Sequence, residues 1–292
     1  MKQYFPFWGR SALQRAEVMA GKGSIGPTLE ILRTLSLDAF GKLMFSLPDP
    51  RYPNLNRMLP AMASEEVQRN WTGNSGPALL RQTVDFAADM AEQYEELAKR
   101  SLKGGRILDY GCGYGRIVRL MYYFSDPERI FAVDPWDESI RLCRESRILG
   151  QLAVSEYLPE SLPISERQFD LIYCFSVFTH LSQRATACAL KTLRNHIRSD
   201  GILVMTIRPE GYWAAAGATA NGRSVEDVVS EHRRCGFAFV PHLRAAVDGD
   251  VTYGDTSMTA EWLEKEFPSW QVAAEHRHRQ DPFQMVLYLR PV

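Results

Sequence analysis

The sequence lacks most features that mark extracellular, membrane and nucleic-acid-binding proteins. Its five cysteines are scattered and none forms a Cys-x-x-Cys pair, which excludes a disulfide-stapled small domain and gives no sign of a zinc or thioredoxin-like site. No apolar run approaches the roughly 18 residues that a membrane-spanning helix needs. The 34 Lys and Arg residues balance 35 Asp and Glu residues, so we expect no basic surface for nucleic acid or for an anionic membrane.

The chain also has few residues of the kinds that prevent folding. Its 20 glycines and 16 prolines are too few for a disordered or fibrous protein, and 45% of its 292 residues are hydrophobic. This length allows one elaborated domain or two small ones, with enough chain to bury a core. The N-terminal residues lack the continuous apolar core of a secretory signal, so we expect a protein of the reducing cytoplasm.

Four short, almost wholly apolar runs are the clearest sign of the fold. They span residues 106–109, 129–134, 169–175 and 201–207. Amphipathic helical patterns separate them, such as residues 136–149 and 183–198, and we expect the second of these helices to stop at residues 199–201. Because strands that are apolar throughout are buried on both faces, this alternation predicts an α/β fold with a doubly wound, mostly parallel sheet. Such sheets bind ligands at the carboxyl ends of their strands.

The segments around this core predict three additions. Residues 1–75 are expected to form an N-terminal helical arm or cap, and a long helix begins near residue 76 and runs to about residue 103. Residues 211–260 interrupt the alternation and form an insertion after the fifth strand, which we expect to cap the substrate. Residues 270–276 and 284–289 are two strands joined by a polar turn, so an antiparallel hairpin is expected to end the sheet. Residues 76–292 would thus form the main domain.

The most informative segment, Leu108-Asp109-Tyr110-Gly111-Cys112-Gly113-Tyr114-Gly115, ends a strand and opens a helix. Its glycines permit a tight turn and a close approach of a ligand to the backbone. A dinucleotide-binding turn would have glycine where this chain has Arg116, and the Asp109 carboxylate would repel a pyrophosphate. Asp109 instead suits an ammonium group, and Asp134 at the end of the next strand can accept hydrogen bonds from both hydroxyls of a ribose. Together these features describe S-adenosylmethionine.

Residues 106–207 resemble the core of the class I S-adenosylmethionine-dependent methyltransferases. Residues 108–115 match the first motif of that family, residues 132–134 its second, and residues 169–174 its fourth strand; residues 198–201 are similar to the turn before its fifth strand, without the usual proline. The resemblance implies a seven-stranded sheet, S-adenosylmethionine as methyl donor and S-adenosylhomocysteine (SAH) as product. It implies nothing about the acceptor.

From the resemblance we expect the donor to lie against the glycine turn and the neighbouring strand ends. Trp136 would stack on the adenine, its alternative being a buried aromatic at a helix start, and Glu156 would bind the adenine amino group unless it is a solvated loop residue. Residues 71–76 are predicted to form a lid over the methionine end of the donor, and the alternative is a simple helix N-cap. The full set of expected donor contacts is Trp71, Thr72, Asp109, Gly111, Cys112, Gly113, Gly115, Asp134, Pro135, Trp136, Glu156 and Phe175.

Two residues that follow strands are candidates for a general base. His180 comes just after the fourth strand and Glu210 just after the fifth, where a sheet of this kind meets its acceptor; a structural histidine and an ordinary loop acid are the alternatives. Tyr212 and Trp213 follow Glu210 and are candidates for acceptor binding. No dense group of His, Cys, Asp and Glu is found in the sequence, so no metal is expected.

The sequence therefore favours a methyltransferase that acts on a small molecule, with O-methylation of a sugar or another secondary metabolite as the preferred reaction. An Asp/Asn-Pro-Pro-Tyr motif after the fourth strand, typical of enzymes that methylate DNA bases, is absent. Two alternatives stay open: a nucleotide-dependent oxidoreductase, which Asp109 and Arg116 disfavour, and a non-catalytic binding subunit with a methyltransferase fold. We expect neither nucleic acid nor a membrane as partner, and the sequence leaves a homodimer open.

Overall fold

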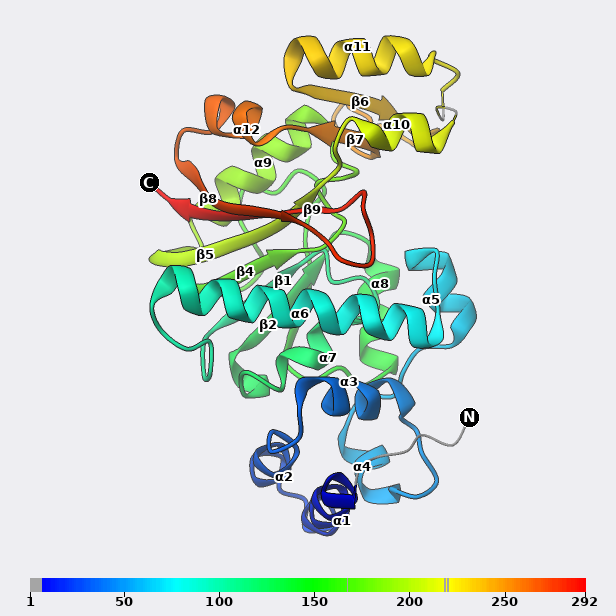
Figure 1. Cartoon of the computed structure of the whole chain (residues 1–292), viewed down its shortest axis with the longest axis vertical. Helices are drawn as coiled ribbons and strands as arrows, with labels where there is room; N and C mark the ends of the chain where they lie inside the picture. The colour runs from blue at the N-terminus through cyan, green and yellow to red at the C-terminus, as the bar shows by residue number, and fades with distance from the viewer. Residues whose placement is uncertain (1–6, 167, 218, 220) are drawn as a thin grey trace.

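The computed structural model describes residues 7–166, 168–217, 219 and 221–292 (Figure 1). In these ranges seven strands form the main sheet: β1 (Ile107–Tyr110), β2 (Ile130–Asp134), β3 (Gln151–Val154), β4 (Phe169–Cys174), β5 (Ile197–Ile207), β8 (Trp270–Arg277) and β9 (Met285–Pro291). Their order is β3-β2-β1-β4-β5-β9-β8. Strands β1 to β5 pair in parallel, whereas β9 runs antiparallel to β5 and to β8. The predicted mostly parallel sheet with an antiparallel C-terminal hairpin is confirmed.

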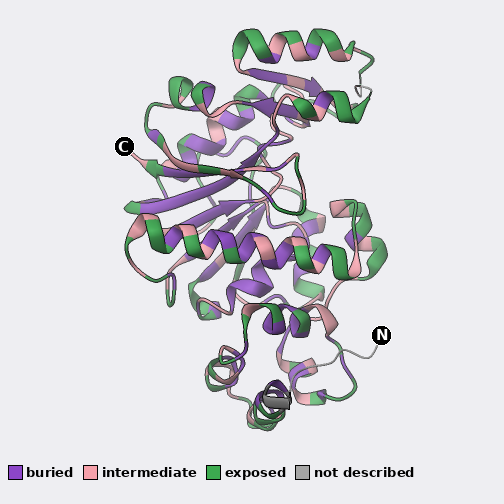
Figure 2. Cartoon of the chain, viewed as in Figure 1, coloured by how far each residue is buried: buried purple, intermediate pink, exposed green. Residues whose placement is uncertain are grey.

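The central strands are apolar throughout because both of their faces are covered. Along β4, Leu171 and Tyr173 join the core beneath the helices of one face, whereas Ile172 and Cys174 join the core on the other face. Figure 2 shows these strands buried along their length between exposed outer helix faces. The sequence pattern of continuous hydrophobic runs therefore reflects burial on two sides.

The helices that cover the sheet are α6 (Gly76–Ala98), α7 (Val118–Met121), α8 (Asp137–Glu145), α9 (Gln183–Arg194) and α12 (Ala260–Glu266), with a 3-10 turn η1 (Pro127–Arg129) before β2. Two of these helices end earlier in the structure than the sequence predicts. Helix α6 stops at Ala98 because Lys99 adopts a left-handed conformation with φ of 55°. Helix α9 stops at Arg194, and the polar residues expected to end it lie inside β5.

Gly201 explains why those polar residues can belong to a strand. A Cβ there would lie 2.8 Å from the carbonyl oxygen of Phe169, so only glycine lets β5 pass this close to β4. The pairing of the two strands also shifts register at this point. The residues that resemble a turn in the sequence therefore form an irregular start of β5.

The N-terminal region is helical, with α1 (Phe7–Gly21), α2 (Ile25–Leu32), α3 (Leu37–Ser46), α4 (Pro53–Met58) and α5 (Glu65–Thr72). Leu29 and Phe40 from this region pack in the same apolar core as Leu120 of α7. The guanidinium of Arg33 also donates to the carbonyl oxygens of Tyr122 and Ser125, at 2.8 and 2.7 Å. Helices α1 to α4 lie below α6 and α7 in Figure 1 and share their core, whereas α5 lies beside the right-hand end of α6.

The insertion after β5 is a small unit with α10 (Gly211–Ala216), α11 (Val225–Cys235) and an antiparallel pair of strands, β6 (Phe237–Pro241) and β7 (Gly254–Met258). Figure 1 shows it at one end of the molecule, above the sheet. Backbone bonds anchor it to the loop after β4, since the amides of Gly254 and Thr256 donate to the carbonyls of His180 and Thr179 at 2.8 and 2.9 Å. The insertion is thus held against the carboxyl end of the sheet.

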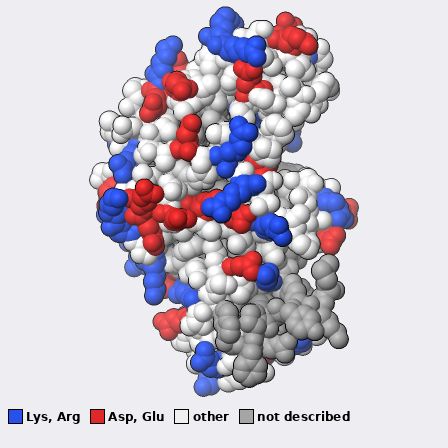
Figure 3. Space-filling view, viewed as in Figure 1, with Lys and Arg blue, Asp and Glu red and all other residues white. Residues whose placement is uncertain are grey.

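The surface and the helices agree with the balanced composition. On the face shown in Figure 3, Lys and Arg side chains alternate with Asp and Glu. None of the helices described is both long and apolar enough to cross a membrane.

Candidate functional site

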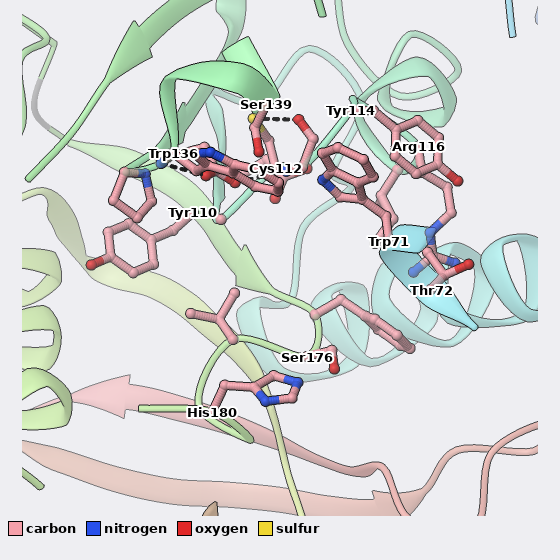
Figure 4. Close-up of a pocket in the computed structure, with 18 of the residues that line it drawn as sticks. Trp71, Thr72, Tyr110, Cys112, Tyr114, Arg116, Trp136, Ser139, Ser176 and His180 are labelled. Carbon is pink, nitrogen blue, oxygen red and sulfur yellow. Dashed lines mark hydrogen bonds between the residues drawn. The ribbon is translucent and has the colours of Figure 1, made fainter. Parts of the chain in front are cut away.

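A cavity of about 750 Å³ lies where β1, β2, β4 and β5 end. Its volume is within the roughly 300–1,000 Å³ of small-molecule sites. Apart from Gly115 and Glu156, every residue expected to contact the donor lines it. Figure 4 shows Trp71 and Trp136 on one side of the space and Ser176 and His180 on the other. We call the first the donor side and the second the acceptor side.

The glycine turn follows β1, and its glycines have distinct roles. Gly111 and Gly113 have φ of 84° and 53°, a region that favours glycine. A Cβ at Gly113 would lie 3.3 Å from Trp71 at the cavity, whereas a Cβ at Gly115 would lie 2.6 Å from the side chain of Ile148. Gly115 was expected to contact the donor, and this is corrected: Gly115 does not line the cavity, and its lack of a side chain lets Ile148 pack against the turn.

Asp109 is a buried carboxylate, and among the described residues its hydrogen-bond partner is Tyr173. The hydroxyl of Tyr173 donates to its Oδ2 at 2.8 Å. Burial raises the pKa of Asp109 to about 8, because a charge is poorly solvated there, although Tyr173 and the more distant Arg116 act in the opposite direction. An ammonium group beside Asp109 would supply the missing counter-charge.

Asp134 ends β2 and is fixed by the backbone. Its Oδ2 accepts from the amide of Gly113 and its Oδ1 from the amide of Trp136, both at 2.9 Å. Burial raises its pKa. Since each carboxylate oxygen has a second lone pair, both can still accept a hydroxyl.

Two tryptophans meet above these acids. The rings of Trp71, at the end of α5, and Trp136, before α8, stack with centroids 4.9 Å apart and planes 12° from parallel. Trp136 is 46% exposed, so the alternative of a buried helix-start aromatic is wrong. Glu156 is exposed and does not line the cavity; its neighbour Tyr157 lines it instead.

His180 occupies the acceptor side as a neutral imidazole. Its Nδ1 lies 2.7 Å from the carbonyl oxygen of Gly254 and therefore carries the hydrogen, which leaves the lone pair on Nε2. Its ring stacks on Tyr253 at 4.8 Å. Burial lowers the pKa of His180 to about 4, and the nearby Arg208 guanidinium adds to this effect.

Arg208, the first residue after β5, connects the sheet to the insertion. Its Nη1 donates to Asp255 Oδ1 at 2.6 Å and to the carbonyl of Thr179 at 2.8 Å, while Nη2 lies 3.4 Å from Nε2 of His180. Asp255 also accepts from His242 Nε2 at 2.9 Å and from the hydroxyl of Tyr212 at 3.0 Å. This network fixes the acceptor side.

The structure does not bring Glu210, Tyr212 and Trp213 to the cavity. The Glu210 carboxylate pairs with Arg233 of α11, at 2.6 Å. Trp213 is buried in the core of the insertion, where its Nε1 donates to Ser257 Oγ at 2.7 Å. The reason is that the chain turns into α10 directly after Glu210, so these side chains face the insertion.

Several lining residues were missed from the sequence, among them Gln284 and Ser176. Gln284 is 6% exposed; its Nε2 donates to Ser176 Oγ at 3.2 Å, and its Oε1 has no hydrogen-bond partner in the described part of the chain. Ser176 has a left-handed backbone with φ of 60° and is the second residue after β4. No sequence motif marks Gln284, because it reaches the cavity only through the pairing of β9 with β5.

A metal site is not evident. Among the side chains that the structure describes, no group of three or more His, Cys, Asp and Glu could hold an ion. The two histidines of the C-terminal region face other partners: His276 lies 3.8 Å from Asp89, and His278 Nε2 lies 3.2 Å from the carbonyl of Gln82.

Comparison with known proteins identifies the central segment. Residues 108–205, which hold the glycine turn and Asp134, match the family model described as a methyltransferase domain. No curated protein matches the chain by sequence.

Solved structures resemble the fold. One is an S-adenosylmethionine-dependent methyltransferase from Clostridium acetobutylicum ATCC 824, with 14% identity, a TM-score of 0.50, and coverage of 77% of this chain and 96% of that one. Another is a magnesium protoporphyrin IX methyltransferase from Synechocystis PCC 6803 with bound SAH, with 12% identity, a TM-score of 0.48, and coverage of 78% and 94%. At such identities the likeness concerns the fold alone.

Proposed function

We propose that the chain is a class I S-adenosylmethionine-dependent methyltransferase, as the match of residues 108–205 to a methyltransferase domain indicates, and that it methylates a small molecule held between the sheet and the insertion. The methyl donor is S-adenosylmethionine and the product is SAH. One observation supports the proposal: Asp109, Asp134 and His180 line the same cavity. Donor and acceptor can therefore meet inside it.

On the donor side, the ribose hydroxyls bind the Asp134 carboxylate and the ammonium group binds Asp109. The donor's carboxylate faces Arg116, a buried cation whose Nη1 is held by Gln82 and Thr83 at 3.1 and 2.7 Å. The adenine stacks on Trp136. Each ionic or polar part of the donor thus has a complementary group.

The reaction is an in-line displacement. A lone pair of the acceptor oxygen attacks the methyl carbon, the carbon–sulfur bond breaks, and its electron pair returns to sulfur, so that the sulfonium becomes the thioether of SAH. The hydroxyl proton leaves to Nε2 of His180. A weak base is sufficient because oxygen becomes strongly acidic as the new bond forms, and holding the reacting atoms about 3 Å apart supplies much of the acceleration.

We favour O-methylation of a hydroxylated small molecule, such as a sugar or another secondary metabolite. A non-catalytic binding subunit is the alternative. The Nε2 lone pair of His180, which accepts only the long 3.4 Å contact from Arg208 among the described residues, can take a proton at the cavity and favours catalysis over it. A nucleotide-dependent oxidoreductase is disfavoured by the buried Asp109 where a pyrophosphate would lie.

Titration calorimetry with SAH tests the donor assignment. Asp134→Ala should weaken SAH binding by about 1–3 kcal/mol, the scale of leaving hydrogen-bonding groups unpaired. Asp137→Ala, which removes an exposed acid three residues away, is the matched control and should bind like the wild type. Unchanged affinity in Asp134→Ala would refute the ribose assignment, and binding of NAD without binding of SAH would refute the function.

A further inference from the structure

The charged residues of the cavity divide between its two sides. Asp109 and Asp134 stand on the donor side, where the sulfonium and ammonium groups of the donor bring positive charge. Arg208 and Arg244 line the acceptor side, together with His180 and Tyr253. The donor proposed above uses the two carboxylates and Arg116, so it leaves these two arginines unoccupied. The other charged lining residue, Asp281, lies on the turn between β8 and β9.

Arg208 presents donors in a fixed orientation. The residue is 9% exposed, and its Nη1 bonds to Asp255 and Thr179 hold the guanidinium plane. The charge of Asp255 is shared, because the same carboxylate also accepts from His242 and Tyr212. The guanidinium lies over the ring of Tyr212 at 4.0 Å. Among the described residues, the hydrogen-bond partner of Nη2 is Nε2 of His180 at the long distance of 3.4 Å, so Nη2 is available to a stronger acceptor.

Arg244 is a second cation at the same wall. Its guanidinium lies over the ring of Tyr253 at 4.1 Å, and the same ring stacks in parallel on His180 at 4.8 Å and meets the ring of His242 edge-on at 5.5 Å. Within the described residues Arg244 has no ion pair, although its backbone amide bonds to His242. Stacking orients a guanidinium and leaves its edge free for the planar, two-pronged recognition of an oxyanion.

We propose that the acceptor carries an anionic oxygen group, a carboxylate or a phosphate, which Arg208 and Arg244 bind beside His180. The inference rests on the proposed function and adds the class of substrate: a small hydroxylated organic acid or phosphate ester. Binding the anion on these two residues places the rest of the acceptor against His180 and Tyr253. An anion next to Arg208 also offsets the field that lowers the pKa of His180, so the substrate strengthens its own base.

The experiment uses simple probes on the full chain saturated with SAH. Calorimetry compares benzoate and phenyl phosphate with benzamide, a neutral molecule of similar shape to benzoate. At least one anion should bind about tenfold more tightly than benzamide, as expected for charge-assisted hydrogen bonds. The preferred anion distinguishes a carboxylic acid substrate from a phosphate ester.

Variants locate the effect. Arg244→Gln changes an exposed side chain and should reduce the anion's affinity about tenfold while leaving that of benzamide unchanged. Arg234→Gln removes the same charge from the exposed face of α11, outside the cavity, and should change nothing. Arg208→Gln should also weaken the anion, but it disturbs the Asp255 network, so Arg244→Gln is decisive.

Equal affinity for anions and benzamide, no binding of any probe, or equal loss in Arg244→Gln and Arg234→Gln would each overturn the proposal. Failure of SAH to bind in the first step would refute the proposed function instead. The two failures are therefore distinguishable.

Discussion

The two sides of the cavity are built from very different amounts of chain. The donor side takes most of its groups from one stretch, residues 109–136, in which two neighbouring strands end. The acceptor side combines the loop after β4, Arg208 after β5, residues 244–253 of the insertion and the turn before β9. Donor recognition is therefore encoded locally, whereas acceptor recognition exists only once distant segments have met.

The two sides also differ in what holds their charges. Backbone amides fix Asp134, one from the glycine turn and one from Trp136 directly before α8, so both come from segments next to the ends of β1 and β2. Arg208 is held by Asp255, a residue of the insertion. A substitution on the donor side should consequently affect every reaction of the protein, while a substitution on the acceptor side should change which molecule is methylated.

The largest effect is expected for Asp109→Asn on the donor side. Loss of the charge opposite the ammonium group should weaken SAH binding by about 2–3 kcal/mol, or roughly 30- to 150-fold, in calorimetry at pH 8.5. The hydrogen bond from Tyr173 can persist to the Asn oxygen, so the fold should be retained. If Asp109→Asn binds SAH as tightly as the wild type, the ammonium assignment is wrong.

The same variant should be more stable than the wild type without ligand. The folded pKa of Asp109 is about 8 and the unfolded value about 4, so between these values the folded state holds more protons and the free energy of unfolding falls as pH rises. The Asn side chain does not ionise, so the variant does not lose free energy of unfolding in this way. At pH 8.5 we expect a gain of about 1–3 kcal/mol, seen as a Tm roughly 2–8 °C higher, and near pH 4 no gain. A lower Tm for Asp109→Asn at pH 8.5 would contradict this.

An intermediate effect is expected for His180→Gln on the acceptor side. Turnover should fall about 10- to 100-fold because the proton acceptor is lost, whereas SAH affinity should stay within twofold. Steady-state methyl transfer and calorimetry on the same preparations separate these quantities. Full turnover in His180→Gln would leave proximity as the source of the rate.

The smallest effect is expected for Glu210→Gln. Its carboxylate pairs with the exposed Arg233 away from the cavity, so turnover should change less than twofold, and stability by about 1 kcal/mol at most. The same two assays and a thermal melt are sufficient. A loss of turnover as large as that of His180→Gln would show that the loop after β5 moves to bring Glu210 into the site.

The contrast between the sides explains what the sequence could and could not predict. Burial on two faces marks strands such as β4, and the glycine turn and Asp134 are close in the chain, so sheet and donor side were predictable. Glu210 was misplaced because a position after a strand end does not determine which way a side chain points. Gln284 and Arg244 could not be found, since only strand pairing and the fold of the insertion bring them to the cavity.

The stack between Trp71 and Trp136 has a consequence for turnover. If the purine lies on Trp136, then Trp71 must move away before the donor can bind. The Trp71 indole thus competes with the purine for the face of Trp136. Displacing it lowers the apparent affinity by the worth of an aromatic pair, about 0.5–1.5 kcal/mol. The same indole can stack on Trp136 again once SAH has departed, so it opposes rebinding of the product.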